Sequence, residues 1–368
     1  MLFGLSSLVY ICGLFTVSAS PELYDWDVLL LSNNKSDLVQ KVSPDHCMEL
    51  LNEDMQYIVT VAWEQFKREF NKTYADNQEH DKRFKLFCQR FMAVREHNKA
   101  YREGKVTFEK GINPFSDQTI EEISLKCCGI PSHNLTTVRG FKYRKLGVEL
   151  PAHVDWRERG AVTRVRSQGT CGSCWAFSVT AAIEGHDFLH SNVLKRLSPQ
   201  QLVDCSTAYG TKGCWGGHPP DAYRYVTDAG GVELDSDYPY VAEQQKCRFD
   251  RNKVVTRITG FVEIPNDEKI LQEAVALYGP IAVAIDALHH SWVDYTKGVI
   301  SEPKCKNARY DTNHAILLIG YGTDEDGTPY WLIKNSQGTW WGEQGYGRII
   351  RNANNMCGIA SYANYPVI

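Results

Sequence analysis

The chain has 368 residues, of which 43% are hydrophobic and 23% are charged. This composition is that of a folded globular protein, and it excludes an intrinsically disordered chain. The length allows two domains, or one domain with an additional segment. The formal net charge is −4 and no long basic run is present, so we expect no nucleic-acid partner.

The first twenty residues, MLFGLSSLVYICGLFTVSAS, carry no charged side chain and have an apolar core from Leu8 to Val17. This core is short for a membrane helix, which needs about 20 apolar residues, and small residues follow it. We therefore predict a secretory signal peptide over residues 1–19, with an uncleaved anchor as the alternative. No later apolar segment is long enough to suggest a membrane partner. The expected destination is the secretory pathway, ending in the lysosome or outside the cell, where disulfides can form.

Residues 20–56 are polar and irregular, and no function is assigned to them. From residue 57 to about residue 102 the pattern turns helical, because large apolar side chains recur at three- and four-residue spacing. These side chains are Trp63, Phe66, Phe70, Phe84, Phe87, Phe91 and Val94. Three sequons predict N-glycosylation, at Asn34, Asn71 and Asn134.

Residues 131–150 are polar and basic, as in an exposed connector between folded parts. Such a connector is a natural place for proteolytic processing, which we predict between Lys145 and Pro151. After residue 150 the chain becomes rich in Gly, Trp and Tyr. Its short apolar runs, such as IAVAI (281–285) and AILLIG (315–320), predict buried strands.

The twelve cysteines are unevenly distributed, and the predicted signal peptide would remove Cys12. Seven lie after residue 150, and an odd number in a secreted domain indicates a free thiol with a purpose. Three disulfides and one reactive cysteine is the simplest interpretation, although six cysteines allow 15 connectivities. Four more precede residue 150, and their pairing stays open: Cys47, Cys88, Cys127 and Cys128.

The stretch SQGTCGSCWAFSVTAAIEGH (167–186) holds Cys171 and Cys174 at the start of an apolar helix. A redox pair would follow a strand in a βαβ unit, which the sequence does not indicate. A zinc site completed by Cys205 and Cys214 has unsuitable spacing, and a disulfide between Cys171 and Cys174 would fit a helix start poorly. The remaining interpretation makes Cys171 structural and Cys174 a nucleophile, because a helix N-terminus stabilises a thiolate.

A thiolate nucleophile needs a base and a group that orients this base. His314 stands before the apolar run AILLIG, and Asn335 stands near the end of the run YWLIKNS. Strand-end positions hold polar groups at a cleft edge while the strand itself is anchored in the core. Each residue alone would be interpreted as structural, and only their combination with Cys174 favours catalysis.

These stretches resemble the papain-like cysteine proteases, in particular the cathepsin L-type group. QGTCGSCWAF (168–177) matches the family signature, with His314 and Asn335 far downstream. Further matching stretches are LVDCS (202–206), GCWGGHP (213–219), YPY (238–240), NHAILLIGYG (313–322), YWLIKNS (330–336) and WGEQGYGRI (341–349). The resemblance covers residues 150–368 and implies an α+β fold of two domains. One is mainly helical and the other barrel-like, with an active-site cleft between them.

The resemblance extends upstream to the family's inhibitory propeptide. Its helix motif is matched by Glu79, Arg83, Phe87 and Asn98, whereas Arg90 and Val94 stand where Asn and Ile are expected. The companion motif Gly-x-Asn-x-Phe-x-Asp is complete as GINPFSD (111–117). The implied organisation is a propeptide over residues 20–149, with its inhibitory helical part at about 57–120, followed by the mature protease at 150–368.

The resemblance implies a role for each catalytic residue. Cys174 attacks the peptide carbonyl as a thiolate beside protonated His314, Asn335 orients the imidazole, and a thioester acyl-enzyme forms. The side chain of Gln168 and the backbone N–H of Cys174 form the oxyanion hole. No metal or cofactor is expected. The implied disulfides are Cys171–Cys214, Cys205–Cys247 and Cys305–Cys357.

The resemblance also implies the substrate-binding residues, which are Gly216, Gly217, His218, Pro219, Ala284, Thr312, Asn313, Trp341 and Tyr362. Tyr362 should shorten the pocket for the residue two positions before the cut bond. This predicts a preference for Leu or Val there. The insertion of carboxydipeptidase relatives is absent between Gly213 and Tyr240, which favours an endopeptidase.

The expected partners are protein or peptide substrates, the chain's own propeptide and cystatin-type inhibitors, and the expected state is a monomer. Two alternatives stay open. The protein could be a catalytically silent papain-like binding or storage module, or its released propeptide could act separately as an inhibitor of related proteases.

One position departs from the family pattern. Gln337 stands directly after Asn335-Ser336, where the family has Trp covering the His–Asn hydrogen bond, and Trp340 is an additional aromatic residue nearby. We expect an active enzyme with slower turnover, which Gln337→Trp should raise if shielding is limiting. Alternatively, Trp340 shields the pair from the neighbouring turn.

Overall fold

The computed structural model describes residues 47–131 and 139–368. The predicted signal peptide, the unassigned segment up to residue 46, and the sequons at Asn34 and Asn134 lie outside these residues. Asn71 lies within them and is exposed. Within the described part of the chain, no helix has the length and apolar character needed to cross a membrane.

The first described elements are a short 3-10 helix, Met48–Leu50, and two long helices, α1 (Glu53–Glu69) and α2 (Asn77–Arg102). The helical pattern expected over residues 57–102 is thus divided by a turn in which Asn71 has a positive φ of 48°. The side chains of Asn52 and Asp76 cap the two helices, by accepting backbone N–H groups of the first turn. Trp63 joins the helices through ring contacts with Phe66, Tyr74, His80, Phe84 and Phe87.

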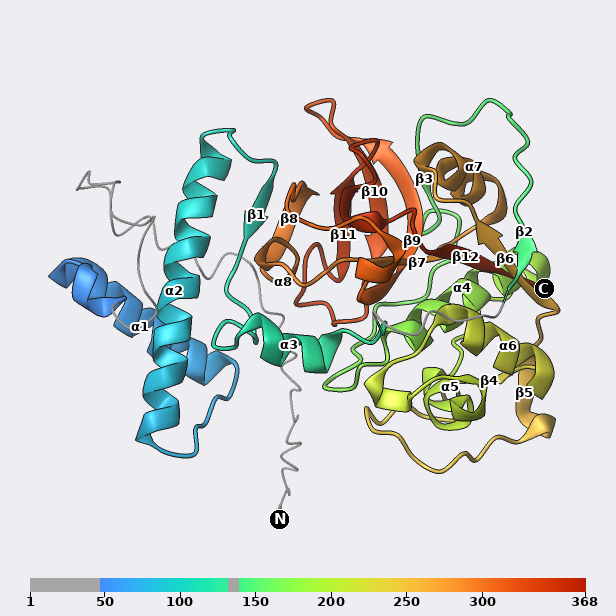
Figure 1. The fold of residues 1–368 in the computed structure, drawn as a ribbon, viewed down its shortest axis with the longest axis horizontal. Coiled ribbons are helices and arrows are strands. Elements are labelled where there is room, and N and C mark those ends of the chain that lie inside the picture. Colours follow the sequence, from blue (N-terminus) through green and yellow to red (C-terminus); the bar gives the residue numbers. More distant parts are fainter. Residues whose placement is uncertain (1–46, 132–138) are drawn as a thin grey trace, which may run out of the picture. The chain divides into compact units, whose positions relative to one another are not determined.

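The next elements carry the chain toward the protease half: β1 (Phe108–Lys110) and α3 (Ile120–Cys127). β1 pairs antiparallel with β8 (Tyr295–Ile300), so the upstream segment extends the main sheet. A capping box between Thr119 and Glu122 starts α3. Figure 1 shows α2 and β1 side by side, next to β8.

The main sheet has the strand order β1-β8-β11-β10-β9-β7-β12-β6-β2, with β3 paired to β9. Its pairs are antiparallel except β8–β11 and β2–β6. The remaining strands are β2 (Phe141–Lys142), β3 (Val154–Asp155), β6 (Gly260–Ile264), β7 (Ile281–Ile285), β9 (His314–Thr323), β10 (Pro329–Lys334), β11 (Tyr346–Ile350) and β12 (Ala363–Val367). The predicted buried strands at 281–285 and 315–320 are therefore confirmed as β7 and the first part of β9.

The helical half surrounds α4 (Cys174–Ser191), whose residues 174–187 are all buried. This confirms the prediction of a helix that is covered on every side.

The remaining elements of both halves of the protease are α5 (Pro199–Cys205), α6 (Pro219–Ala229), α7 (Glu268–Tyr278), α8 (His290–Val293), β4 (Val232–Glu233), β5 (Val254–Thr256) and 3-10 turns at Thr207–Tyr209, Gly213–Trp215, Arg251–Lys253, Arg309–Asp311 and Met356–Gly358.

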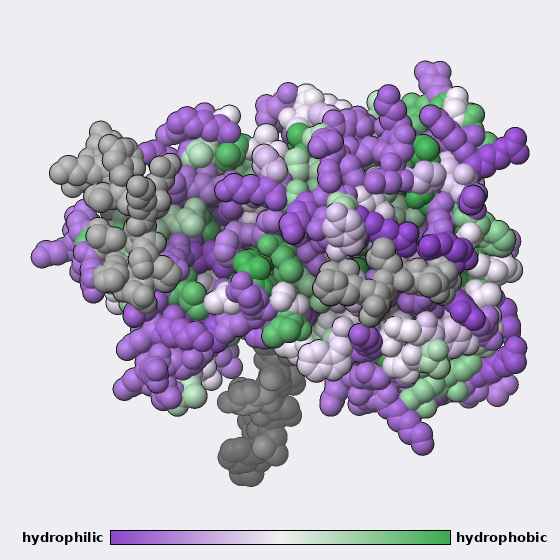
Figure 2. Space-filling view, in the orientation of Figure 1, coloured by the Kyte–Doolittle hydropathy of each residue, from purple (hydrophilic) through white to green (hydrophobic). Residues whose placement is uncertain are grey.

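Buried apolar side chains form two clusters. One fills the sheet and includes residues of β7, β9, β10 and β12. The other fills the helical half around α4 and α6. On the face shown in Figure 2, hydrophilic residues cover most of the helical pair α1 and α2, as expected for a pair whose apolar side chains pack inward.

Four disulfides link the described residues. Cys171–Cys214, Cys205–Cys247 and Cys305–Cys357 are the pairs that the resemblance implied. The fourth, Cys47–Cys88, joins the segment before α1 to the middle of α2 and answers part of the question that the sequence left open.

The connector before the protease half is more ordered than its composition suggests. Over residues 139–150 it contains β2, and the side chain of Glu273 on α7 accepts three hydrogen bonds from it. The donors are the Tyr143 hydroxyl and the backbone N–H groups of Leu146 and Gly147, at 2.7–2.9 Å. The segment proposed for processing is therefore held against α7.

Candidate active site

Cys174 is the first residue of α4, and its side chain is fully buried. Its Sγ accepts backbone N–H groups of Gly129, at 3.2 Å, and Ala315, at 3.4 Å. A sulfur at a helix N-terminus that accepts N–H donors is stabilised in its thiolate form. Because Ala315 directly follows His314, the sulfur also lies beside the start of β9.

His314 and Asn335 meet because β9 and β10 are paired antiparallel strands. His314 begins β9, and Asn335 follows the last residue of β10. The Nε2 atom of His314 lies 2.9 Å from Oδ1 of Asn335, and both residues are buried. The other ring nitrogen, Nδ1, takes no part in this contact and can serve as the base, as expected for an imidazole that one amide orients.

The amide of Asn335 is held at both of its ends. The backbone N–H of Ser336 donates to Oδ1, at 2.8 Å, and Nδ2 donates to Oε1 of Gln337, at 3.1 Å. Gln337 is buried and holds Asn335 through this hydrogen bond. The sequence pattern indicated only reduced shielding at position 337. The structure thus adds an anchoring contact that the pattern of aromatic residues could not reveal.

The aromatic side chain beside His314 is Trp292, which the sequence analysis missed. Their ring centroids are 5.8 Å apart at an angle of 62°. Trp341 packs behind Trp292 with a tilted ring at 4.5 Å and donates its Nε1–H to the backbone oxygen of Trp292. Trp340 contacts Phe115 at 5.5 Å instead. No local signal could have found Trp292, because it lies 22 positions before His314 in the sequence and only the fold brings the two residues together.

Gln168 is buried and lies next to the loop that precedes α4. Its Nε2 donates to the backbone oxygen of Cys171 at 2.9 Å, and its Oε1 accepts the hydroxyl of Ser336 at 2.7 Å. The hydroxyl of Tyr240 donates to the backbone oxygen of Gln168 and lies 2.6 Å from Oγ of Ser173. Tyr240 therefore braces both sides of this loop, a role that the sequence did not indicate.

Residues 129 and 130 lie across the site between the two halves of the protease. The backbone N–H of Gly217 donates to the oxygen of Gly129 at 2.8 Å, and the N–H of Ile130 donates to the oxygen of Asn313 at 3.1 Å. A Cβ atom on Gly129 would lie only 1.9 Å from the oxygen of Gly172, so only glycine fits here. The upstream segment thus covers Cys174 directly.

The side chain of Ile130 lies in a buried apolar cluster that includes two of the residues predicted for the substrate pocket. Ile130 is buried and belongs to the same apolar cluster as Cys174, Ala284 and Tyr362. The rings of His218 and Tyr362 are 5.9 Å apart, and the guanidinium of Arg309 lies 4.1 Å from the Tyr362 ring centroid.

The other predicted substrate-binding residues divide into two groups. The first group was predicted for the same pocket and consists of Gly216, Pro219 and Thr312. A Cβ atom on Gly216 would lie 2.7 Å from the Gly129 oxygen, and Pro219 and Thr312 are buried. Trp341 lies on the His314 side of the site, behind Trp292, and is fully buried.

A buried polar network supports the end of β10 next to Asn335. Nζ of Lys334 donates to Oγ1 of Thr163 at 3.0 Å, and Thr163 donates to Glu184, which also pairs with Arg166 at 2.8 Å. Burial lowers the pKa of Lys334 to about 8. The network compensates a buried cation and fixes the strand end from which Asn335 extends.

Upstream motif residues hold the first helices and α3 together. Arg83 pairs with Glu79 and Glu122, and donates to the backbone oxygen of Asp117. The carboxylate of Asp117 accepts Nζ of Lys72 at 2.9 Å and the Tyr74 hydroxyl at 3.0 Å. Asn98 exchanges two hydrogen bonds with Lys110 of β1.

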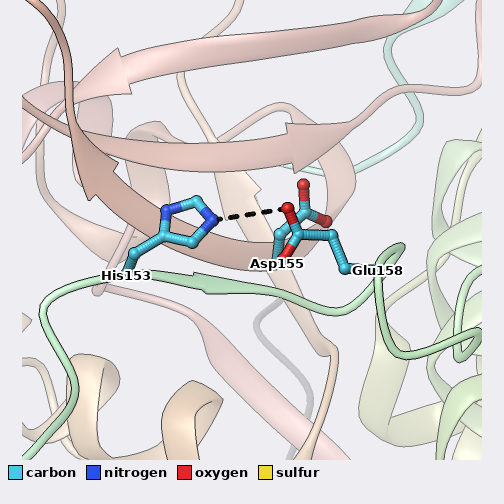
Figure 3. Close-up of side chains that lie close together, drawn as sticks. All are labelled: His153, Asp155 and Glu158. Carbon is cyan, nitrogen blue, oxygen red and sulfur yellow. Dashed lines mark ion pairs between the residues drawn. The ribbon is translucent and has the colours of Figure 1, made fainter.

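A group of possible metal ligands, His153, Asp155 and Glu158, lies on β3 and directly around it in the chain (Figure 3). His153 and Glu158 are exposed, and their charged atoms are 3.9 Å apart. The carboxylate of Asp155 already accepts Nε and Nη2 of Arg157 at 2.6–3.0 Å. The neutralised carboxylate makes this group a surface ion-pair cluster, separate from the residues around Cys174.

Comparisons with known proteins agree on both halves of the chain. A family model described as papain family cysteine protease matches residues 150–367, and one described as cathepsin propeptide inhibitor domain matches residues 63–123. Cathepsin L of Sarcophaga peregrina is 42% identical over 340 residues, which cover 90% of this chain and 96% of that protein. Cathepsin S of Mus musculus is 42% identical over 311 residues, covering 83% and 90%.

A solved structure extends the similarity to the fold. Digestive procathepsin L 3 from the larval midgut of Tenebrio molitor matches with a TM-score of 0.77 and 40% identity. The match covers 84% of this chain and 99% of that one, so it includes the segment before the protease half.

Proposed function

Because this chain belongs to the papain family of cysteine proteases and carries the family's propeptide inhibitor domain, we propose that Cys174, His314, Asn335 and Gln168 are its catalytic residues. The protein is a cathepsin L-like cysteine endopeptidase made as a zymogen, with the papain-like fold. The observation that carries the residue assignment is the hydrogen bond from Gly129 N–H to Cys174 Sγ, because the inhibitory segment lies on the atom that would attack substrate.

In the proposed mechanism, the Cys174 thiolate attacks the scissile carbonyl carbon and forms a tetrahedral intermediate. Protonated His314 gives its proton to the leaving amine as the C–N bond breaks, which leaves a thioester on Cys174. His314 then takes a proton from water, the resulting hydroxide attacks the thioester, and the C–S bond breaks. Asn335 keeps the imidazole oriented through the 2.9 Å contact with Nε2.

The proposed oxyanion hole consists of the Gln168 side-chain amide and the backbone N–H of Cys174. Its support is the restrained position of Gln168, which Ser336, Cys171 and Tyr240 hold from three sides. Restraint before substrate arrives means that little reorganisation is needed in the transition state. One such donor stabilises the transition state by roughly 3–4 kcal/mol.

We propose that the pocket around Ala284 and Tyr362 selects medium apolar side chains two positions before the cut bond. The support is Ile130, a branched aliphatic residue that is buried in the same apolar cluster as Ala284 and Tyr362 in the zymogen. Burial raises the pKa of the Tyr362 hydroxyl, so the hydroxyl stays neutral and offers no negative charge to pair with a cationic substrate side chain. A substrate panel with a dominant preference for Arg at this position contradicts the assignment.

The proposed boundaries are a signal peptide at 1–19, a propeptide at 20–149 and the mature enzyme at 150–368. The propeptide inhibits the enzyme that it precedes, and the enzyme acts on peptide substrates. The proposed destination is the lysosome or the extracellular space, and the proposed state is a monomer that cystatin-type inhibitors can bind. The N-terminal apolar stretch and the disulfides support the secretory route.

One experiment tests the catalytic assignment. The purified chain is acidified mildly with a thiol-reactive epoxysuccinyl inhibitor present, and its mass is measured. We expect the loss of the residues before about position 150 and a single adduct on Cys174.

Absence of the adduct, even after an added protease has removed the propeptide, contradicts the assignment and favours the silent binding module. The Cys174→Ala variant is the control, since it should process with an added protease but never carry the adduct.

A further inference from the structure

A buried ion pair joins the propeptide to the protease. Nη1 of Arg90, on α2, lies 2.6 Å from Oδ1 of Asp294, which follows α8. The two side chains are only 6% and 1% exposed. The residues are 204 positions apart in the chain, so the contact is entirely between the two parts of the zymogen.

Several further contacts converge on the same point. Nδ2 of Asn113 donates to Oδ1 of Asp294 at 3.3 Å and to the oxygen of Val293 at 3.0 Å. The backbone N–H of Gly111 donates to the oxygen of Asp294 at 2.7 Å. The guanidinium of Arg90 reaches both Asp294 and the backbone oxygen of Gln118. Arg90 thus ties α2, the 111–118 segment and the protease together.

The cation in contact with Asp294 is Arg90. Nδ1 of His290 lies farther away, 3.7 Å from Oδ2 of Asp294, on a side chain that is half exposed, and partial burial, followed by the charges of Arg90 and Lys110, lowers its pKa. Burial raises the pKa of Asp294 itself, and Arg90 opposes this effect. A buried carboxylate that loses its charged partner is strongly destabilised.

We propose that the Arg90–Asp294 pair makes the protease surface around α8 and β8 selective for a propeptide that carries an arginine at this position of α2. A propeptide with the uncharged, shorter Asn, which stands here in the family motif, would leave Asp294 buried without its ion pair. It could not reach Asp294 and Gln118 together. The occupant that this surface accepts is therefore the chain's own propeptide, and related propeptides without the arginine are rejected.

This inference deepens the proposed function and rests on it for one of two readouts. The first readout does not need catalysis: thermal unfolding and hydrogen exchange over residues 108–118 and 290–300, in full-length zymogens that carry Cys174→Ala. The second is the rate at which Cys174 is labelled by an epoxysuccinyl inhibitor at neutral pH in the unprocessed zymogen. Failure of labelling in activated wild-type enzyme would contradict the catalytic assignment alone, since the first readout would still measure the ion pair.

The proteins to compare form a double-mutant cycle: wild type, Arg90→Asn, Asp294→Asn and the double variant. Each single variant should be labelled roughly 30-fold faster or more, because breaking one side of a buried charge pair is costly, and hydrogen exchange should rise at both segments. The double variant should be labelled about as fast as either single variant. Lys99→Asn is the matched control, because it removes an exposed cation from the same helix and should match wild type.

Charge exchange guards against a simple loss of folding. Arg90→Asp combined with Asp294→Arg should be labelled more slowly than either charge reversal alone. Wild-type labelling and exchange in Arg90→Asn would overturn the proposal, as would effects of the two single variants that multiply in the double variant.

Discussion

At the scale of single residues, the centre depends on how the Asn335 amide is held. Its oxygen can face His314 only if its nitrogen faces an acceptor, and Oε1 of Gln337 is this acceptor. A Trp at position 337 would offer no oxygen to Nδ2. Gln337 therefore has an anchoring role in this chain, beside any effect on shielding.

Replacing Gln337 by Met tests this role, since Met has a similar volume but no acceptor oxygen. We expect kcat to fall about fivefold with KM unchanged, because one hydrogen bond contributes about 1 kcal/mol. Steady-state kinetics on a peptide substrate measures both constants. Gln245→Met, at an exposed glutamine, is the control. An unchanged kcat in Gln337→Met contradicts anchoring, and a raised kcat in Gln337→Trp favours shielding as the limiting factor.

At the scale of elements, the propeptide engages the protease through several different segments, in addition to the contact of Arg90 on α2 with Asp294. β1 extends the sheet at β8, the 111–118 loop reaches Trp340 through Phe115, and residues 129–130 cross the site. The connector then lies on α7 through Glu273. Each segment makes its own contacts, so their contributions can be tested separately.

The contact between Phe115 and Trp340 predicts a measurable hold on the propeptide. In Trp340→Ala, the unprocessed zymogen should label at Cys174 about three- to tenfold faster, because an aromatic pair contributes roughly 0.5–1.5 kcal/mol. Tyr57→Ala removes an exposed aromatic ring from α1 and should label at the wild-type rate. Equal labelling of Trp340→Ala and wild type would show that the ring contact adds nothing.

Glu273 predicts a dependence of processing on pH. Burial raises the pKa of this carboxyl, but the N–H groups of Leu146 and Gly147 and the Tyr143 hydroxyl outweigh it and hold the pKa below its usual value. Stabilisation of the connector is then complete above the usual pKa, about 4.3, and decreases as the pH falls through the lower folded value. Acid should therefore release the segment in which processing is proposed.

Glu273→Gln should shift processing to higher pH, since it loses the charge at every pH. An added protease cleaves zymogens that carry Cys174→Ala over a series of pH values, and mass spectrometry measures the extent of cleavage. Self-processing cannot contribute in this variant. Glu158→Gln, at an exposed carboxyl, is the control. Superimposable pH profiles for Glu273→Gln and wild type would exclude Glu273 as the restraint.

At the scale of the whole molecule, the propeptide is stabilised by its own disulfide. Cys47–Cys88 closes a loop of 41 residues between the start of the described chain and α2. In the chain-entropy model, closing a loop of this length lowers the entropy of the unfolded chain and so raises its free energy by about 4 kcal/mol. The inhibitory domain therefore gains stability in an oxidising compartment, in addition to its aromatic cluster around Trp63.

The paired variant Cys47→Ala/Cys88→Ala should lower the free energy of unfolding of the propeptide by about 2–4 kcal/mol. Denaturant unfolding of a full-length Cys174→Ala zymogen, monitored through hydrogen exchange in α1 and α2, measures the change. The pair Cys205→Ala/Cys247→Ala should instead affect the protease half. A propeptide of unchanged stability would mean that this disulfide adds little to the packing of the two helices.

Much of the candidate site could be predicted because its residues stand in local patterns. The helix that starts at Cys174 follows from an apolar run, and the strand ends that hold His314 and Asn335 follow from short apolar runs with polar termini. Trp292, Tyr240 and the Glu273 contact with the connector were not predictable in this way. Their partners are far away in the chain, and nothing in their local sequence indicates which residues they contact.

The sequence by itself determined which residue types stand at the ends of which elements, because periodicity and chain punctuation are local properties of the backbone. Only the tertiary structure decided the pairs Arg90–Asp294, Trp292–His314 and Cys47–Cys88. The first depends on the packing of α2 beside β1 and β8, and the other two also join segments that are separated in the chain. Such contacts arise from burying apolar surface across the whole chain, so no single segment contains the information that specifies them.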